Sequence, residues 1–134
     1  MPKQIIGSPS APVVGITPGE AVSPLAQAIR FGHMLFLSGQ GAVDPVTDDV
    51  IEGNIATQTR RTLDNVMSIL GASGATAENV VNMRVTLRNT ADYPGFNEAF
   101  RDYFGGDKIT RTCFGGTPNR AGVNVQIDCT AMFD

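Results

Sequence analysis

The strongest constraint on the fold is a change of apolar periodicity between residues 54 and 87. Over residues 54–70 the apolar side chains recur at intervals of three and four, and Thr59 fills a gap in this stripe. Over residues 80–87 polar and apolar side chains alternate, with Val81, Met83, Val85 and Leu87 on the apolar side. The first spacing predicts an amphipathic helix, and the second predicts a strand with one buried face. A helix and a strand of these kinds bury their apolar faces against each other in layered folds.

The other segments predict a short helix–sheet fold. We expect a second helix at 93–104, and strands at 3–6, 25–31, 34–38, 110–114 and 123–132. A chain of 134 residues fits one domain of roughly 100–150 residues. We therefore predict a single domain over 1–134, of class α+β: a two-layer sandwich of a mixed β-sheet with two helices on one face. The other face needs a different cover, for which oligomerisation is the simplest solution.

Several residues predict where the two helices begin and end. Asn54 and Asp92 are the expected N-caps of the two helices, because short polar side chains there accept a backbone hydrogen bond. Gly71 and Gly74 are the expected stop signals of the first helix, and residues 105–106 end the second. Four prolines between residues 7 and 24 predict a loop.

Composition excludes several classes of function. The formal charge of −3, with basic residues scattered, gives no footprint for nucleic acid. The start lacks the apolar region of a secretory signal, and no stretch is long enough to span a membrane, so we expect a cytoplasmic protein. Cys113 and Cys129 should be free thiols. With His33 as the single histidine, no metal site is expected.

Four segments in register resemble the Rid/YjgF family of reactive-intermediate (enamine/imine) deaminases. They are PLAQAIRFGHMLFLSGQGAVDPVTDDVIEGNIATQTRRTLDNVMSIL, VVNMRVTLRNTADYPGFNEAFRDYF, TRTCF and VQIDCTAM. The resemblance implies a chorismate-mutase-like trimeric barrel, with helices outside and a cleft at each of the three subunit interfaces. It also implies hydrolysis of enamines or imines to 2-oxo acids and ammonia, without a cofactor.

Arg111 is the central candidate site residue. In the resembling family the Arg at this position grips the substrate carboxylate, and the planar guanidinium fork suits that task. The alternative for Arg111 is an ordinary surface or interface salt bridge. Cys113 lies two residues on, and so on the same strand face, where it is either a pocket residue or a small buried side chain.

The resemblance places further residues in the cleft, and some depart from the family pattern. Gly39 and Asn97 match cleft-lining positions, although each could serve local structure instead. Leu25 stands where the well-characterised deaminases have a Tyr. Gln126 stands where they have a carboxylate proposed to position the attacking water, and an amide cannot take up a proton near neutral pH. An alignment shifted by two would place Asp128 there, but we favour Gln126.

Three functions follow from these residues. The first is a hydrolytic deaminase of a small carboxylate-bearing enamine or imine, including a catabolic enamine such as 2-aminomuconate, with Arg111 and Gln126 as catalytic residues. The second is a non-catalytic homotrimer that binds a small carboxylate metabolite. The third, a ribonuclease, ranks last because the sequence shows no basic stripe or aromatic stacking surface.

Overall fold

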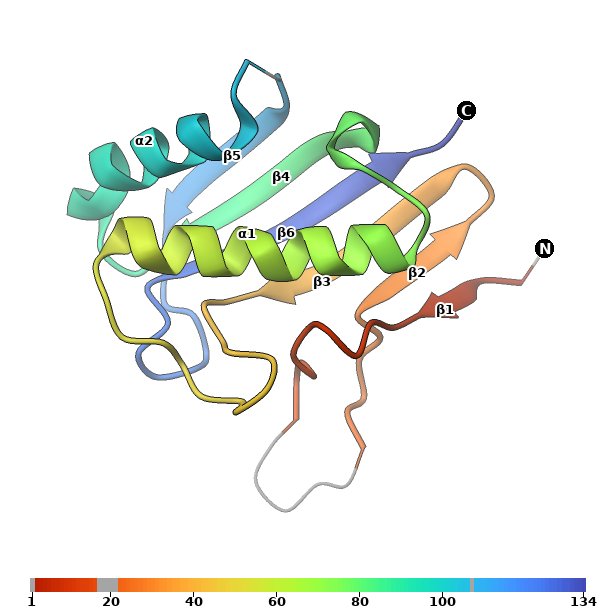
Figure 1. The fold of residues 1–134 in the computed structure, drawn as a ribbon, viewed down its shortest axis with the longest axis horizontal. Helices are drawn as coiled ribbons and strands as arrows, with labels where there is room; N and C mark the ends of the chain where they lie inside the picture. The colour runs from red at the N-terminus through yellow and green to blue at the C-terminus, as the bar shows by residue number, and fades with distance from the viewer. Residues whose placement is uncertain (1, 17–21, 107) are drawn as a thin grey trace.

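In the computed structural model, two helices lie across one face of a six-stranded sheet (Figure 1). The structure describes residues 2–16, 22–106 and 108–134. The strands are β1 Gln4–Ile6, β2 Ala28–Phe31, β3 Met34–Gln40, β4 Val80–Leu87, β5 Thr110–Gly115 and β6 Val125–Met132. The helices are α1 Ile55–Ala72 and α2 Tyr93–Phe104, with short 3₁₀ turns η1 Ala77–Asn79 and η2 Thr90–Asp92. The predicted α+β sandwich with two helices on one face is confirmed.

The sheet has the strand order β1-β2-β3-β6-β4-β5. All neighbouring strands are antiparallel except β4 and β5, which run parallel because α2 forms the crossover between them. The parallel strand β5 lies at one edge of the sheet, next to α2. Because β5 has a neighbouring strand on one side only, its side chains lie near the surface of the subunit.

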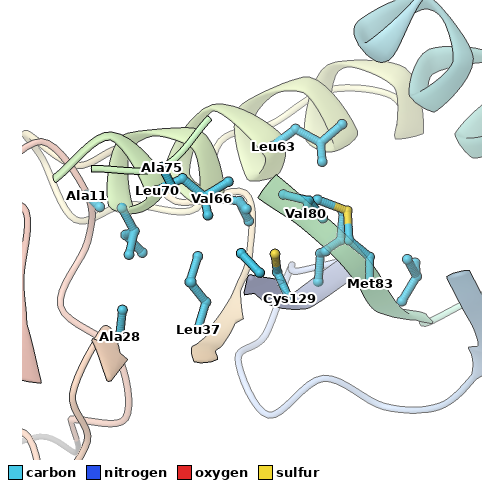
Figure 2. Packing of buried hydrophobic residues seen from close by; sticks show 14 of the residues in the cluster. Ala11, Ala28, Leu37, Leu63, Val66, Leu70, Ala75, Val80, Met83 and Cys129 are labelled. Atoms are coloured by element: carbon cyan, nitrogen blue, oxygen red, sulfur yellow. The ribbon is translucent and has the colours of Figure 1, made fainter. Parts of the chain in front are cut away.

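The core fills the space between α1 and the central strands (Figure 2). Leu63, Val66 and Leu70 of α1 are fully buried, as the helical spacing predicts. Val125, Ile127 and Cys129 of β6 face them, each at most 2% exposed. The alternation predicted for 123–132 is therefore confirmed, and it turns Gln126, Asp128 and Thr130 to the opposite face of the sheet.

One predicted face in β4 is wrong. Val80 is buried and Val81 is 44% exposed, whereas the alternation placed Val81 inside. The pairing with β6 shifts between Val80 and Asn82, so two residues of β4 span one step of β6. Such an irregularity reverses the facing of the residue before it. From Met83 onward the predicted alternation holds.

Some predicted boundaries also need correction. Leu25 lies outside β2, which begins at Ala28, because residues 22–27 follow an irregular path. Gly71 does not stop α1, which continues to Ala72, whereas Gly74 follows its end with a φ of 79°. Asp92 makes no side-chain cap, because its own backbone is already helical. The expected loop at 7–24 is partly described, and residues 17–21 lie outside the described part.

The face of the sheet away from the helices carries apolar side chains. Met34 and Phe36 alternate with the buried Leu35 and Leu37, and are 39% and 45% exposed. Phe114 and Met132 are also exposed. Among the helices that the structure describes, none is both long and apolar enough to cross a membrane. Exposed apolar residues gathered on one sheet face indicate a surface that another molecule covers.

The two helix starts give a matched test of capping. The Asn54 side chain accepts a hydrogen bond from the Thr57 N–H over 2.9 Å, while Asp92 makes no such bond. Asn54→Ala should therefore lower the free energy of unfolding by about 1 kcal/mol. Asp92→Ala should lower it by only about 0.3 kcal/mol, through the helix dipole. Urea unfolding measures both, and equal losses would contradict this assignment.

Candidate functional site

Arg111 of β5 lies against polar and aromatic side chains of α2. Its Nη2 donates to the Tyr93 hydroxyl over 2.8 Å and to Asn97 Oδ1 over 2.9 Å. Its guanidinium carbon lies 4.7 Å from the ring centre of Phe100 and 5.2 Å from that of Phe96. Among the described residues, Nη2 alone of its nitrogens has a hydrogen-bond partner. A held guanidinium with free N–H groups is suited to bind an anion.

Local structure explains why these side chains meet. Arg111 pairs with Met83 in the register of β4 and β5, and Met83 is fully buried under the helices, so Arg111 points to the helix face. Tyr93 and Asn97 are four residues apart and therefore share one side of α2. Sequence reasoning found Asn97 but missed Tyr93, although the four-residue spacing could have indicated it.

Cys113 lies on the same strand face as Arg111, as predicted. Its thiol is half-buried and packs against the core. Burial raises the pKa of Cys113, and the positive charge of Arg111 partly offsets this rise. Cys113 therefore lies beside Arg111 on the helix face of β5. We name Arg111, Tyr93, Asn97 and Cys113 the arginine cluster.

Gln126 borders a separate cavity of about 910 Å³, which we name the Gln126 cavity. Leu25 and Gly39 also line it. Its other walls come from residues 12–16, 39–41, 43, 119–121 and 123, together with Asp48. The structure thus brings together Leu25, Gly39 and Gln126, three residues taken from distant parts of the sequence.

Gly39 and Gln126 fit closely against each other. A Cβ atom at position 39 would lie 2.8 Å from Gln126 Nε2, closer than real side chains approach. Because Gly39 has no side chain, the Gln126 amide can occupy the space beside it. Asp128, two residues on, is on the same face but forms an ion pair with Arg84, with 3.0 Å between Oδ1 and Nε.

Buried amides and a guanidinium hold the loops around the Gln126 cavity. Gln58 of α1 bonds to the backbone of Ile51, Gly122 and Asn124, which joins two of the loops. Arg88 donates to the carbonyl oxygens of Pro118, Arg120 and Val123. Sequence reasoning missed both residues, and they carry no distinctive motif.

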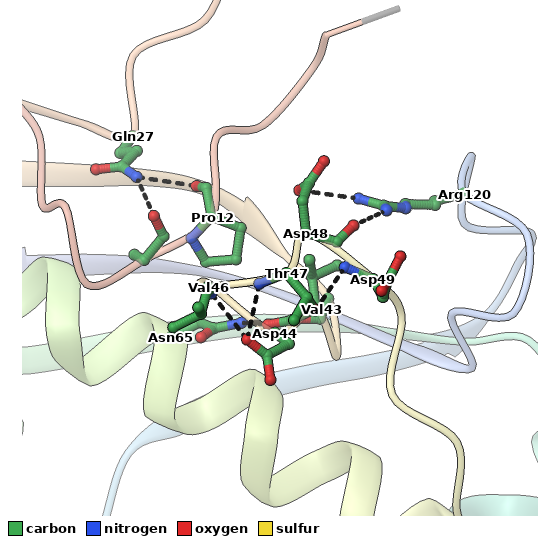
Figure 3. A network of polar contacts seen from close by, with 12 residues as sticks. Pro12, Gln27, Val43, Asp44, Val46, Thr47, Asp48, Asp49, Asn65 and Arg120 are labelled. Carbon is green, nitrogen blue, oxygen red and sulfur yellow. Dashed lines mark hydrogen bonds and ion pairs between the residues drawn. The ribbon is translucent and has the colours of Figure 1, made fainter. Parts of the chain in front are cut away.

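Two more amides fix the other walls (Figure 3). The Gln27 amide nitrogen donates to the carbonyl oxygens of Ser8, Ala11 and Pro12, and Asn65 donates to those of Gly41 and Val43. Since each loop is bound to the scaffold by several hydrogen bonds, the cavity is largely formed before any ligand enters.

Within one chain the arginine cluster and the Gln126 cavity do not meet. Arg111 points to the helix face of the edge strand β5, whereas Gln126 of β6 points to the opposite face. The predicted site residues thus form two groups: Arg111, Asn97 and Cys113 in one, and Leu25, Gly39 and Gln126 in the other. In the described residues, no three His, Cys, Asp or Glu side chains group as metal ligands.

Residues 17–133 match the family model described as Endoribonuclease L-PSP. The chain belongs to this family. The resemblance to Rid/YjgF proteins is thereby confirmed. A RutC family protein of Pyrococcus abyssi is 34% identical over 111 residues, which are 83% of this chain and 82% of that protein. A protein of Mus musculus named 2-iminobutanoate/2-iminopropanoate deaminase is 27% identical and covers 97% of this chain and 91% of its own.

Solved structures of the L-PSP family share the fold. TdcF of E. coli with bound serine superposes with a TM-score of 0.85 at 28% identity, covering 98% of this chain and 99% of its own. A putative endoribonuclease of Thermotoga maritima gives a TM-score of 0.86 at 28% identity, with 98% of each chain covered.

The two cysteines should differ in reactivity, and Arg111 should affect only one of them. Since a cation favours the thiolate, Arg111→Met should raise the pKa of Cys113 further and slow its alkylation by iodoacetamide at pH 8. Cys129 is 2% exposed, and burial raises its pKa to about 12, so it should stay unmodified in both proteins. Mass spectrometry over a pH series measures both rates. Faster alkylation of Cys113 in the variant would contradict this electrostatic coupling.

Proposed function

We propose that this L-PSP family chain is a hydrolytic deaminase of small carboxylate-bearing enamines or imines, which releases a 2-oxo acid and ammonia. The observation that supports it best is the guanidinium of Arg111, held by Tyr93 and Asn97 with N–H groups free. Relatives named 2-iminobutanoate/2-iminopropanoate deaminase from Mus musculus and Dermatophagoides farinae match almost the whole chain. E. coli TdcF, whose solved structure is similar to this chain, contains bound serine, which supports a site for a small amino or imino acid.

The proposed site forms between two subunits of a homotrimer. One subunit supplies the arginine cluster at its edge strand β5, and its neighbour supplies the Gln126 cavity on the opposite sheet face. This arrangement would also cover the exposed Met34, Phe36 and Phe114, which otherwise leave apolar surface in water. The separation of the two residue groups in one chain supports this assembly, because neither group alone offers both an anion clamp and a pocket.

In the proposed reaction, Arg111 binds the substrate carboxylate and sets the orientation of the imine carbon. Two charge-assisted hydrogen bonds to the guanidinium would fix both position and angle. Asn97 and Tyr93 hold the guanidinium against the aromatic rings of α2, so that little ordering remains to be done on binding.

Hydrolysis then needs a water molecule at the imine carbon. The Gln126 amide would orient this water by hydrogen bonding but would not take its proton. Water adds to the carbon of the protonated C=N bond, and one proton of the added water passes to the amino nitrogen, which gives a protonated carbinolamine. The C–N bond then breaks as the hydroxyl oxygen forms the C=O bond, and the hydroxyl proton goes to the departing ammonia, so that the products are the 2-oxo acid and ammonium. Because the substrate nitrogen itself accepts the proton, the step requires no carboxylate from the protein.

Loss of the guanidinium should remove most activity. Arg111→Ala should lower kcat/KM for 2-iminobutanoate by roughly 100-fold, since two charge-assisted hydrogen bonds are lost. Arg101→Ala is a matched control, because Arg101 is an exposed residue of α2 outside the site. Ammonia release from the imine, generated in situ by a threonine dehydratase, measures both variants. Full activity of Arg111→Ala would overturn the assignment of the clamp.

Complementation between two inactive variants tests the shared site. Arg111→Ala removes the arginine cluster, and Gly39→Leu displaces Gln126 on the other side of the subunit. Each variant alone should be inactive, whereas co-expressed chains should regain part of the activity, because mixed trimers contain some intact pairs. If the mixture stays inactive while mixed trimers are present, the two groups do not form one site.

A second function is favoured by Gln126 and Leu25. These side chains stand in the cavity where a carboxylate and a hydroxyl would assist hydrolysis, so the chain could be a non-catalytic homotrimer that binds a small carboxylate metabolite. Calorimetric binding of 2-oxobutyrate without turnover of any imine would identify this case. Cleavage of RNA is less supported, since a chain with net charge −3 attracts polyanions weakly.

A further inference from the structure

The Gln126 cavity has an apolar wall that the proposed chemistry does not use. It is formed by the apolar lining residues Val13, Val14, Ile16, Leu25, Val43 and Val123. Val13, Ile16 and Leu25 are 57%, 39% and 51% exposed, although side chains of this type are usually covered. Exposed apolar residues that converge on one cavity mark a place for an apolar group.

Several hydrogen bonds hold the segments that carry this apolar wall. The Gln27 amide binds the carbonyl oxygens of Ala11 and Pro12, which fixes the start of the segment that carries Val13 and Val14. The Ser23 hydroxyl donates to the Val14 carbonyl oxygen and accepts from the Leu25 N–H, which ties the two parts of the wall together. Gly15 has a φ of 71°, and a Cβ there would lie 2.5 Å from Leu25 Cδ1. This close approach lets the segment pack directly on the Leu25 side chain.

The cavity offers no free charge for a second anionic group. Asp48 and Arg120 are the charged residues among those lining its described part, and they pair with each other, with 3.5 Å between Oδ1 and Nη1. The remaining polar side chains, Gln40, Asn119 and Gln126, are neutral amides. A second carboxylate placed there would have to compete with Asp48 for Arg120, and so would gain less than it would from an unpaired cation.

The cavity of one chain has room for more than a three- or four-carbon acid before a neighbouring subunit closes part of it. At about 910 Å³ the cavity falls near the upper end of the ~300–1,000 Å³ typical of sites for much larger ligands. In the proposed assembly the neighbouring subunit would close part of this space, but the wall contributed by this chain would keep its apolar character.

We propose that the Gln126 cavity is a specificity subsite for the side chain of an imino monocarboxylate with a bulky apolar group, such as the imine of leucine. This inference rests on the proposed function, because it assumes that Arg111 of the neighbouring subunit binds the single carboxylate. It disfavours dicarboxylates, since among the described residues that line the cavity the one cation, Arg120, is already paired with Asp48.

Binding of unreactive 2-oxo acids tests the subsite separately from catalysis. Calorimetry with 4-methyl-2-oxopentanoate, 2-oxobutyrate and 2-oxoglutarate should show the first binding roughly tenfold tighter than the second, because two more carbon groups are buried. 2-Oxoglutarate should bind most weakly. Equal affinities for the first two acids, or tightest binding of 2-oxoglutarate, would overturn the inference.

Single substitutions test whether the apolar wall causes the preference for 4-methyl-2-oxopentanoate. Val13→Asp should abolish the preference for 4-methyl-2-oxopentanoate, and the exposure of Val13 should allow the variant to fold. Val14→Thr, which keeps the side-chain shape, should reduce the preference in the same direction. Val46→Asp is the control, since Val46 is 92% exposed and outside the cavity, and it should leave the preference unchanged. An unchanged preference in both Val13→Asp and Val14→Thr would also overturn the inference.

Parallel turnover assays distinguish this inference from the proposed function. The preference for 4-methyl-2-oxopentanoate without hydrolysis of any imine would reject the deaminase and retain the subsite. Hydrolysis of 2-iminobutanoate without that preference would retain the deaminase and reject the subsite. If none of the three acids binds at millimolar concentration and no imine is hydrolysed, both are rejected.

Discussion

The burial of one sheet face under α1 and α2 is the constraint on which the rest of the structure depends. Over most of β3, β4 and β6 it commits alternate residues to the core, with side chains such as Leu35, Met83 and Ile127 fully buried. The residues between them are thereby turned to the uncovered face, where Gln126 lies beside Gly39. At the edge of the sheet, α2 leaves β5 only half covered, and Arg111 occupies this boundary between the core and water.

Much of this arrangement could be predicted from the sequence because it depends on periodicity. The spacing of Leu63, Val66 and Leu70 and the alternation from Val125 to Ala131 placed the central helix and strand correctly. The errors fall where one residue changes the register or the path of the chain. An irregular step reverses Val80 and Val81, and no local pattern in the sequence signals it.

The candidate site could be predicted only in part. Alternation placed Arg111 and Cys113 on one face, and the family resemblance indicated Asn97, Gly39, Leu25 and Gln126. Residues that act through tertiary contacts were out of reach, because Gln58 bonds to Gly122 across 64 positions and Arg88 gathers carbonyl groups 30 or more positions away. Tyr93, whose hydroxyl accepts a hydrogen bond from Arg111, was also missed, although its four-residue spacing from Asn97 on one side of α2 could have indicated it.

The close fit of Gly39 against Gln126 has a consequence for how sequences of this fold can diverge. A side chain added at position 39 would enter the space of the Gln126 amide, and since this amide is the end of a flexible side chain, it would turn away rather than block the substitution. A substitution at position 39 would then move the amide without any change at position 126. The direction in which the amide points is therefore set by a neighbour that carries no functional group of its own.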